Sequence, residues 1–153
     1  MPFLLDTTVI SAARRVEKQE IAFQNFMRDF DVNEAFLSSI SIMELRFGIQ
    51  REMHRDPEFA ADLARWLNEV VLPEFADRIL SFDLAVALRA GGLPTPEKRP
   101  TADAMIADAM IAATALEHNL QVVTRNIAYF EALGAPCLDP WRYMPRPEAS
   151  KEV

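Results

Sequence analysis

The sequence predicts an α/β domain with a mainly parallel central sheet and helices on both faces. Short apolar runs that suit buried strands alternate along the chain with stretches that suit helices, and no hairpin turn joins two runs. The length of 153 residues is that of one domain, and 50% hydrophobic residues suffice for a substantial core. In such sheets ligands bind beyond the carboxyl ends of the strands, so polar residues there are the first candidates for a functional site.

The first half of the chain predicts two strands and three helices. The strands are short apolar runs. Each helix shows apolar residues at helical spacing or begins beside a residue that can serve as an N-cap. In chain order, we expect a strand at 2–5, a helix at 7–14, a helix at 21–30, a strand at 35–40 and a helix at 41–53. Thr7 or Thr8 is the expected N-cap of the first helix.

The second half alternates helices and strands in the same way. Pro57 suits the first turn of a helix, and the apolar stripe that follows it is expected to end at Pro73. In chain order, we then expect a strand at 78–82, a helix at 84–90 capped by Asp83, a proline-rich connection at 93–100, a helix at 103–118, a strand at 120–124, a helix at 127–133 and a last strand at 136–138. Residues 1–142 should form the domain, and 143–153, which are charged and proline-broken, a disordered tail.

Composition limits the classes of function. The chain carries 16 basic and 23 acidic residues, a formal charge of −7. This balance argues against a protein that binds nucleic acid mainly through its overall positive charge. It is compatible with a nucleic-acid enzyme whose carboxylates are neutralised by bound metal. The single cysteine, Cys137, cannot form an internal disulfide, and no apolar run suits a membrane span or a signal peptide. A cytoplasmic protein is therefore expected.

Asp6 directly follows the first apolar run, at the carboxyl end of the first predicted strand. An aspartate at this position can simply cap the next helix, although Thr7 and Thr8 already offer caps. The other interpretation is a functional carboxylate at the mouth of the sheet.

Glu44 belongs to the sequence SIME, which matches a capping box. In that motif Ser41 caps the helix, and Glu44 bonds back to the Ser41 amide. The capping role and a functional role are compatible, because a glutamate in the first turn of this helix also faces the mouth of the sheet.

Asp108 lies within the helix predicted at 103–118. Its face of that helix, at offsets of three, four and seven, is formed by Ala104, Ile111, Ala112 and Ala115. This face is apolar, and a buried carboxylate needs a cation, hydrogen bonds or a metal. No lysine or arginine occurs between Arg99 and Arg125 to pair with it locally. Asp108 is therefore a candidate functional residue, with a buried structural hydrogen bond as the alternative.

Asn126 follows the strand at 120–124, and an asparagine is also an ordinary turn residue. Asp6, Glu44, Asp108 and Asn126 come from four separate segments that can meet at one edge of the sheet. Carboxylates at such short distances repel one another unless divalent cations lie between them. A site whose ligands are all oxygen atoms suits Mg²⁺ or Mn²⁺. Such a site suits phosphodiester hydrolysis.

Four stretches resemble the PIN domain, specifically the VapC toxins and their FitB-like relatives. These stretches are LLDTTVIS, LSSISIMELRFGI, ADAMIAATALEHNLQVVTRN and PCLDPW. The resemblance implies a PIN-like three-layer α/β/α fold and a ribonuclease that uses Mg²⁺ or Mn²⁺. It also implies the toxin of a type II toxin–antitoxin pair: an endoribonuclease that cuts structured RNA, binds a VapB-like antitoxin and forms a homodimer.

Within the matching stretches, three acids fall on the metal-binding acids of the family: Asp6, Glu44 and Asp108. Asn126 falls where relatives carry Asn or Asp, and would be a neutral ligand or a group behind the ligands. Many relatives carry a further aspartate where this chain has Tyr129, so a fourth carboxylate is missing and a second metal is in doubt. Glu131 is close by in sequence.

Two other interpretations remain open at this stage. One is a catalytically weak or inactive PIN-fold module that binds RNA or an antitoxin, which the missing fourth acid would favour. The other is a phosphotransfer domain with Asp6 as acceptor, which lacks a second acid at Thr8 and a lysine after the late strand. In the ribonuclease interpretation, Arg46 and Arg125 are candidates for phosphate contacts.

Overall fold

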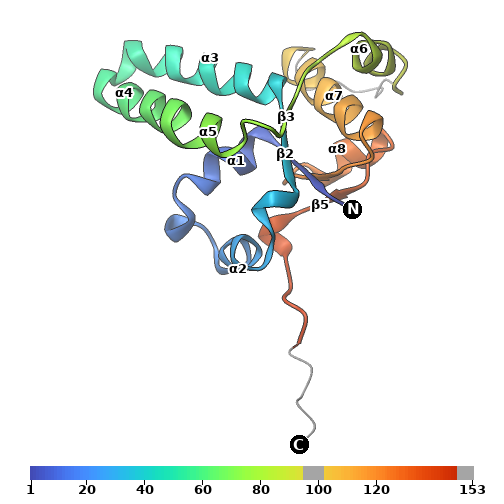
Figure 1. Ribbon diagram of the computed structural model, residues 1–153, viewed down its shortest axis with the longest axis horizontal. Coiled ribbons are helices and arrows are strands. Elements are labelled where there is room, and N and C mark those ends of the chain that lie inside the picture. Colours follow the sequence, from blue (N-terminus) through green and yellow to red (C-terminus); the bar gives the residue numbers. More distant parts are fainter. Residues whose placement is uncertain (95–101, 148–153) are drawn as a thin grey trace, which may run out of the picture.

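A five-stranded parallel sheet organises the protein (Figure 1). The computed structural model describes residues 1–94 and 102–147, with the backbone alone for 102–105. In spatial order, the strands are β3 (Ile79–Leu80), β2 (Ala35–Ser38), β1 (Phe3–Leu5), β4 (Gln121–Val123) and β5 (Cys137–Leu138). Neighbouring strands pair in parallel throughout, as connections through helices require. The predicted fold class is confirmed.

Helices fill the connections, and each predicted helix is present. Their bounds are α1 (Thr7–Ala13), α2 (Ile21–Asp29), α3 (Ser39–Arg55), α4 (Pro57–Trp66), a π-helical segment η3 (Leu67–Val71), α5 (Leu72–Glu74), α6 (Leu84–Gly91), α7 (Ala102–Glu117) and α8 (Ile127–Ala132). Single turns of 3-10 helix are η1 (Val16–Lys18), η2 (Val32–Glu34) and η4 (Pro140–Arg142). No helix in the described part of the chain is long and apolar enough to cross a membrane.

The sheet separates two apolar cores, which makes the fold three-layered. Successive strand residues point to opposite faces, so Leu5 and Val123 enter one core, while Leu4 and Val122 enter the other. Helices α1 to α5 cover the first face, and α7 and α8 cover the second (Figure 1). Burial against both faces explains why the strands read as short continuous apolar runs.

Two predicted helix caps are wrong. Asp6, not Thr7 or Thr8, caps α1, which confirms the capping interpretation of Asp6, and its Oδ1 accepts from the Thr7 amide at 2.8 Å. Helix α3 begins two residues earlier than predicted because Ser38 Oγ accepts from the Ile40 amide at 3.1 Å. The capping box is therefore absent, and its two side chains are available for other contacts.

The segment after Pro57 differs from the prediction at its end. Pro57 starts α4, but the helical path runs past Pro73 through η3 into α5 and ends at Glu74. Pro73 is the second residue of α5, directly after the π-helical segment η3. The apolar stripe divides accordingly, with Leu67 and Val71 buried and other members partly on the surface.

The beginning of the predicted tail contacts the domain. The Tyr143 hydroxyl donates to Asp29 Oδ2 at 2.9 Å, and its ring packs edge-on against Phe26. Residues 148–153 of the tail and 95–100 of the proline-rich connection lie outside the described residues, so the predictions for them stay predictions.

Candidate active site

The centre of the site lies where β1 and β4 end side by side. Leu5 pairs with Val123, so Asp6 and Thr124 leave the sheet together. The Asp6 amide donates to the Val123 carbonyl at 3.0 Å, and the Thr124 hydroxyl donates to Asp6 Oδ2 at 2.8 Å. The carboxyl edge of the sheet thus holds a carboxylate at its middle, as the sequence predicts.

Asp6 is buried, with 6% of its surface exposed. Beyond the Thr7 amide and the Thr124 hydroxyl, it accepts a long bond of 3.5 Å from Thr8 Oγ1. Burial nevertheless raises the pKa of Asp6 above its usual value, because desolvation outweighs these donors, and the Glu44 charge adds to the rise. The buried charge is therefore unfavourable by itself, and either a proton or a cation beside the carboxylate would relieve it.

Thr7 connects Asp6 to Glu44. Its hydroxyl lies 2.7 Å from Glu44 Oε1 and 2.9 Å from Ser41 Oγ. A threonine hydroxyl has one proton, which the carboxylate attracts more strongly, so we assign the Ser41 hydroxyl as donor to Thr7. Since the Thr7 amide also binds Asp6, this residue holds α1 against α3 and fixes both acids.

Asp108 enters the site from α7. Its neighbours Ile111, Ala112 and Ala115 are fully buried, as predicted for this face of the helix, whereas Asp108 itself is half-buried. Burial, followed by the charges of Asp6 and Glu44, raises its pKa to about 7. The Asn126 side chain hydrogen-bonds Asp108 and partly offsets this rise. The four predicted site residues are therefore close enough to interact.

The donor chemistry fits a divalent cation with few protein ligands. The three acids repel one another, and a cation between them would relieve the repulsion. Within the described residues, however, no three Asp, Glu, His or Cys side chains are placed to hold a metal ion as a set. Mg²⁺ often keeps several waters and takes one or two carboxylates, which this arrangement can supply.

Other residues near the site have identifiable roles in packing. The Arg125 guanidinium lies 4.0 Å from the centre of the Trp141 ring, whereas Arg46 is exposed on α3. Tyr129 packs its ring edge-on against Phe130 within an apolar core. The charge of Glu131, after burial, raises the pKa of the Cys137 thiol.

Sequence reasoning missed Thr7 and Thr124 as part of the site. The sequence offers Thr7 only as a possible cap, and it places Thr124 at the carboxyl edge of the sheet without indicating a role for its hydroxyl. A usable signal was present, because a threonine that ends a fully apolar strand must bury its hydroxyl beside some acceptor.

Thr124→Val is expected to reduce the free energy of unfolding by about 1–2 kcal/mol at neutral pH, because the buried Asp6 carboxylate loses its hydroxyl donor. Valine matches threonine in volume and suits a strand end. Denaturant unfolding measures the change, with Thr8→Val as the control because Thr8 is exposed and its bond is long. Equal effects of the two substitutions would contradict a special role for Thr124.

Comparison with known proteins gives the family. Residues 3–135 match the family described as PIN domain. The chain is 33% identical to the toxin FitB of Neisseria gonorrhoeae over 138 residues, which cover 90% of this chain and 97% of that protein. It is 34% identical to the VapC ribonuclease Y4jK of Sinorhizobium fredii over 138 residues, which cover 90% and 96%.

Solved structures share the architecture. A chain in the structure of FitAB bound to an IR36 DNA fragment superposes with a TM-score of 0.79 at 30% identity, covering 95% of this chain and 99% of that one. The DNA-bound VapBC structure from Salmonella typhimurium shares the fold, with a TM-score of 0.61, 23% identity and coverage of 92% and 98%. By the extent of these matches, the chain belongs to the PIN-domain family.

Proposed function

We propose that this protein is the toxin of a type II toxin–antitoxin pair and acts as a divalent-metal-dependent endoribonuclease on structured RNA. The observation that carries the proposal is that Asp6 after β1, Glu44 on α3 and Asp108 on α7 lie close enough for their charges to affect one another. Thr7 joins two of these acids, since its amide contacts Asp6 and its hydroxyl contacts Glu44. The relatives named toxin FitB and VapC ribonuclease support this function.

The roles of the acids follow from their surroundings. Asp6 and Asp108 would hold a Mg²⁺ or Mn²⁺ ion directly, and Glu44, oriented by Thr7, would complete the shell or orient the attacking water. When bound, the ion would lower the pKa of a water and neutralise charge developing on the phosphate. Asn126 would keep Asp108 oriented through its amide, since it carries no charge for a second ion.

RNA cleavage tests the proposal directly. The purified protein, freed of any partner, is incubated with structured RNA in Mg²⁺ or Mn²⁺ and, as a control, in EDTA. Cleavage that requires the metal is the expected result. Binding of RNA without cleavage under either metal would favour the inactive module instead, which the absence of a fourth acid at Asn126 and Tyr129 makes a definite competitor.

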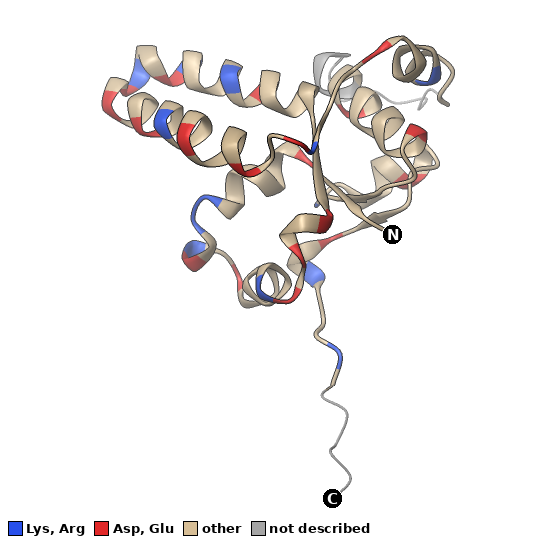
Figure 2. Ribbon diagram, in the orientation of Figure 1, with Lys and Arg blue, Asp and Glu red and all other residues tan. Residues whose placement is uncertain are grey.

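An antitoxin is the partner that we propose, because the similar structures are FitAB and VapBC complexes. A groove of about 490 Å³ lies between α1, α3 and α4. Its wall contains the apolar Leu45, Ile49, Leu63 and Trp66. The helices α3 and α4 that border it also carry both basic and acidic residues (Figure 2). Thr7 and Glu44 also line it, so it joins the acidic centre. An amphipathic antitoxin helix suits such a groove, and a segment continuing from it would reach the acids.

Coexpression with a VapB-like antitoxin is expected to yield a complex, and the toxin is expected to be at least a homodimer by light scattering. Gly48→Leu should prevent copurification, because it fills the groove, and only the end of Arg51 lies within 4 Å of the added Cβ. Gln50→Leu, on an exposed position of α3, is the matched control. A monomer that stays unchanged when the antitoxin is coexpressed would count against this partner.

A further inference from the structure

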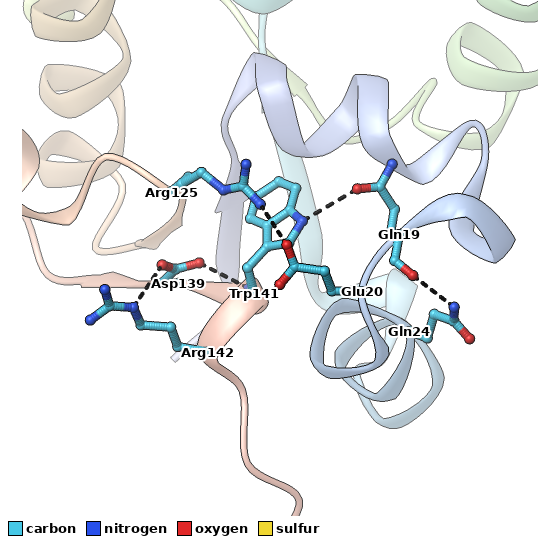
Figure 3. A network of polar contacts seen from close by, with 7 residues as sticks. All are labelled: Gln19, Glu20, Gln24, Arg125, Asp139, Trp141 and Arg142. Atoms are coloured by element: carbon cyan, nitrogen blue, oxygen red, sulfur yellow. Dashed lines mark hydrogen bonds and ion pairs between the residues drawn. The ribbon is translucent and has the colours of Figure 1, made fainter.

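We infer that Trp141 is a positioning residue for the active site. It holds Arg125, and through Arg125 it fixes the turn that places the Asn126 side chain on Asp108. The inference rests on the proposed function for its link to activity, but the contacts that carry it lie outside the acidic centre. Figure 3 shows these contacts, in which η4 and the segment before α2 meet the turn after β4.

The Arg125 side chain lies across Trp141. Its guanidinium is 4.0 Å from the ring centre, and its Nη2 lies 4.0 Å from Glu20 Oε1 (Figure 3). The Arg125 side chain keeps 58% of its surface exposed, so the ion pair with Glu20 adds little by itself. The cation–π contact of the guanidinium over the indole is therefore the contact that defines the direction of this side chain.

Trp141 is itself held on several sides. Its ring centre is 4.7 Å from that of Phe23, which is fully buried, and its indole N–H donates to Gln19 Oε1 at 3.3 Å. Its backbone N–H donates to Asp139 Oδ1 at 2.9 Å. The indole is thus a fixed surface supplied by the C-terminal segment and by the chain before α2, and Arg125 rests on it.

The turn that carries Arg125 also carries the site. On one side of Arg125, the Thr124 hydroxyl donates to Asp6. On the other side, the Asn126 amide donates to Thr124 Oγ1 at 3.0 Å, and the Asn126 side chain bonds Asp108. Asn126 is exposed and lacks a side-chain cap contact with α8, so little else in its own helix fixes its orientation. Anchoring Arg125 restricts the rotation of this turn.

A direct contact between Arg125 and an RNA phosphate is the competing role, and conservative substitutions separate the two. Lysine retains the charge but lacks the flat guanidinium that lies over the indole. If Arg125 acts through Trp141, Arg125→Lys and Trp141→Leu should each lower kcat about tenfold with KM changed less than about twofold, since small misplacements in a site cost that much or more. The double variant should lose no more than either single one.

The test combines kinetics with NMR. The side-chain amide signals of Asn126 are assigned by their loss in Asn126→Asp. In the metal-free protein, their chemical shifts should move toward those of an asparagine without a hydrogen-bond partner in Trp141→Leu and Arg125→Lys. Trp141→Phe keeps an aromatic surface and should restore both the signals and kcat. Tyr143→Phe is the matched control, because Tyr143 also packs on α2 but belongs to a different contact.

Three results would overturn the inference. Unmoved Asn126 signals in folded Trp141→Leu would show that the contact between Arg125 and the indole does not position the turn. Normal kcat in Arg125→Lys with a raised KM in Arg125→Ala would assign Arg125 to the phosphate. Additive losses in the double variant would show independent roles. If the wild type cleaves no RNA, the proposed function fails. The NMR experiment still shows whether Trp141 and Arg125 position the Asn126 side chain. Arg125→Lys keeps the test valid if Trp141→Leu does not fold.

Discussion

Asp108→Asn is expected to abolish growth arrest and RNA cleavage while leaving the protein folded. Asparagine keeps the shape and part of the hydrogen bonding, but it removes a charge from the site. Asp6→Asn should have the same effect, since both acids are proposed to contact the ion. We expect cleavage to fall at least roughly 100-fold, the scale of losing one positioned catalytic group. Expression without antitoxin and a cleavage assay measure both effects.

Glu117→Gln is the matched control on the same helix. Glu117 pairs with Arg89 at 2.7 Å on the surface, so its replacement should change stability little and activity not at all. Circular dichroism and thermal melts establish that each variant is folded. A folded Asp6 or Asp108 variant that remains fully toxic would show that the site is assigned wrongly.

The sheet and the place of the acids could be predicted because their signals are local. A strand buried on both faces is a continuous apolar run, and Asp6 ends such a run directly. Asp108 stood out because its helical face is otherwise apolar. In both cases, one element carries the whole pattern, and its neighbours in space need not be known.

The capping of α3 could not be decided from sequence. Two serines three positions apart, Ser38 and Ser41, can each cap a helix. The choice depends on where β2 stops, and Ser38 is the last residue of β2 and pairs with Leu80 of β3. Ser41 then lies within α3, where it contacts Thr7, 34 residues away in the chain. The pairing of β2 with β3 thus fixes the start of α3, and Ser41 of the SIME motif contacts the site and does not cap the helix.

Trp141 shows the same limit. Its sequence context, PCLDPW, resembles the family and includes the last predicted strand, but nothing nearby indicates a partner for an indole. Its partners Phe23, Gln19 and Arg125 come from α2, the segment before it and the turn after β4. A residue that connects three distant segments gives no periodic signal in any of them.

The metal-free Asp108→Asn variant is expected to be more stable than the metal-free wild type at pH 8. The pKa of Asp108 is raised to about 7 in the folded protein, above its ordinary value of 3.8. Between these values the folded state binds more protons than the unfolded state, so wild-type stability should fall as pH rises from about 4 to about 7. Discounted for its partial exposure, the effect is on the order of 1–2 kcal/mol. The variant should lack this fall.

Bound metal should make the wild type more stable than the Asp108→Asn variant. At about 100 times its dissociation constant, Mg²⁺ or Mn²⁺ is expected to stabilise the wild type by roughly 2.7 kcal/mol. For a domain of this size, that raises Tm by about 5–10 °C. Asp108→Asn should respond little, and Ca²⁺ should act more weakly because it takes more ligands than this site offers. Melts at pH 5 and pH 8, with EDTA or metal, measure both effects. A metal-free variant clearly less stable than wild type at pH 8 would identify Asp108 as a structural hydrogen-bonding group, because relief of charge repulsion can only stabilise it.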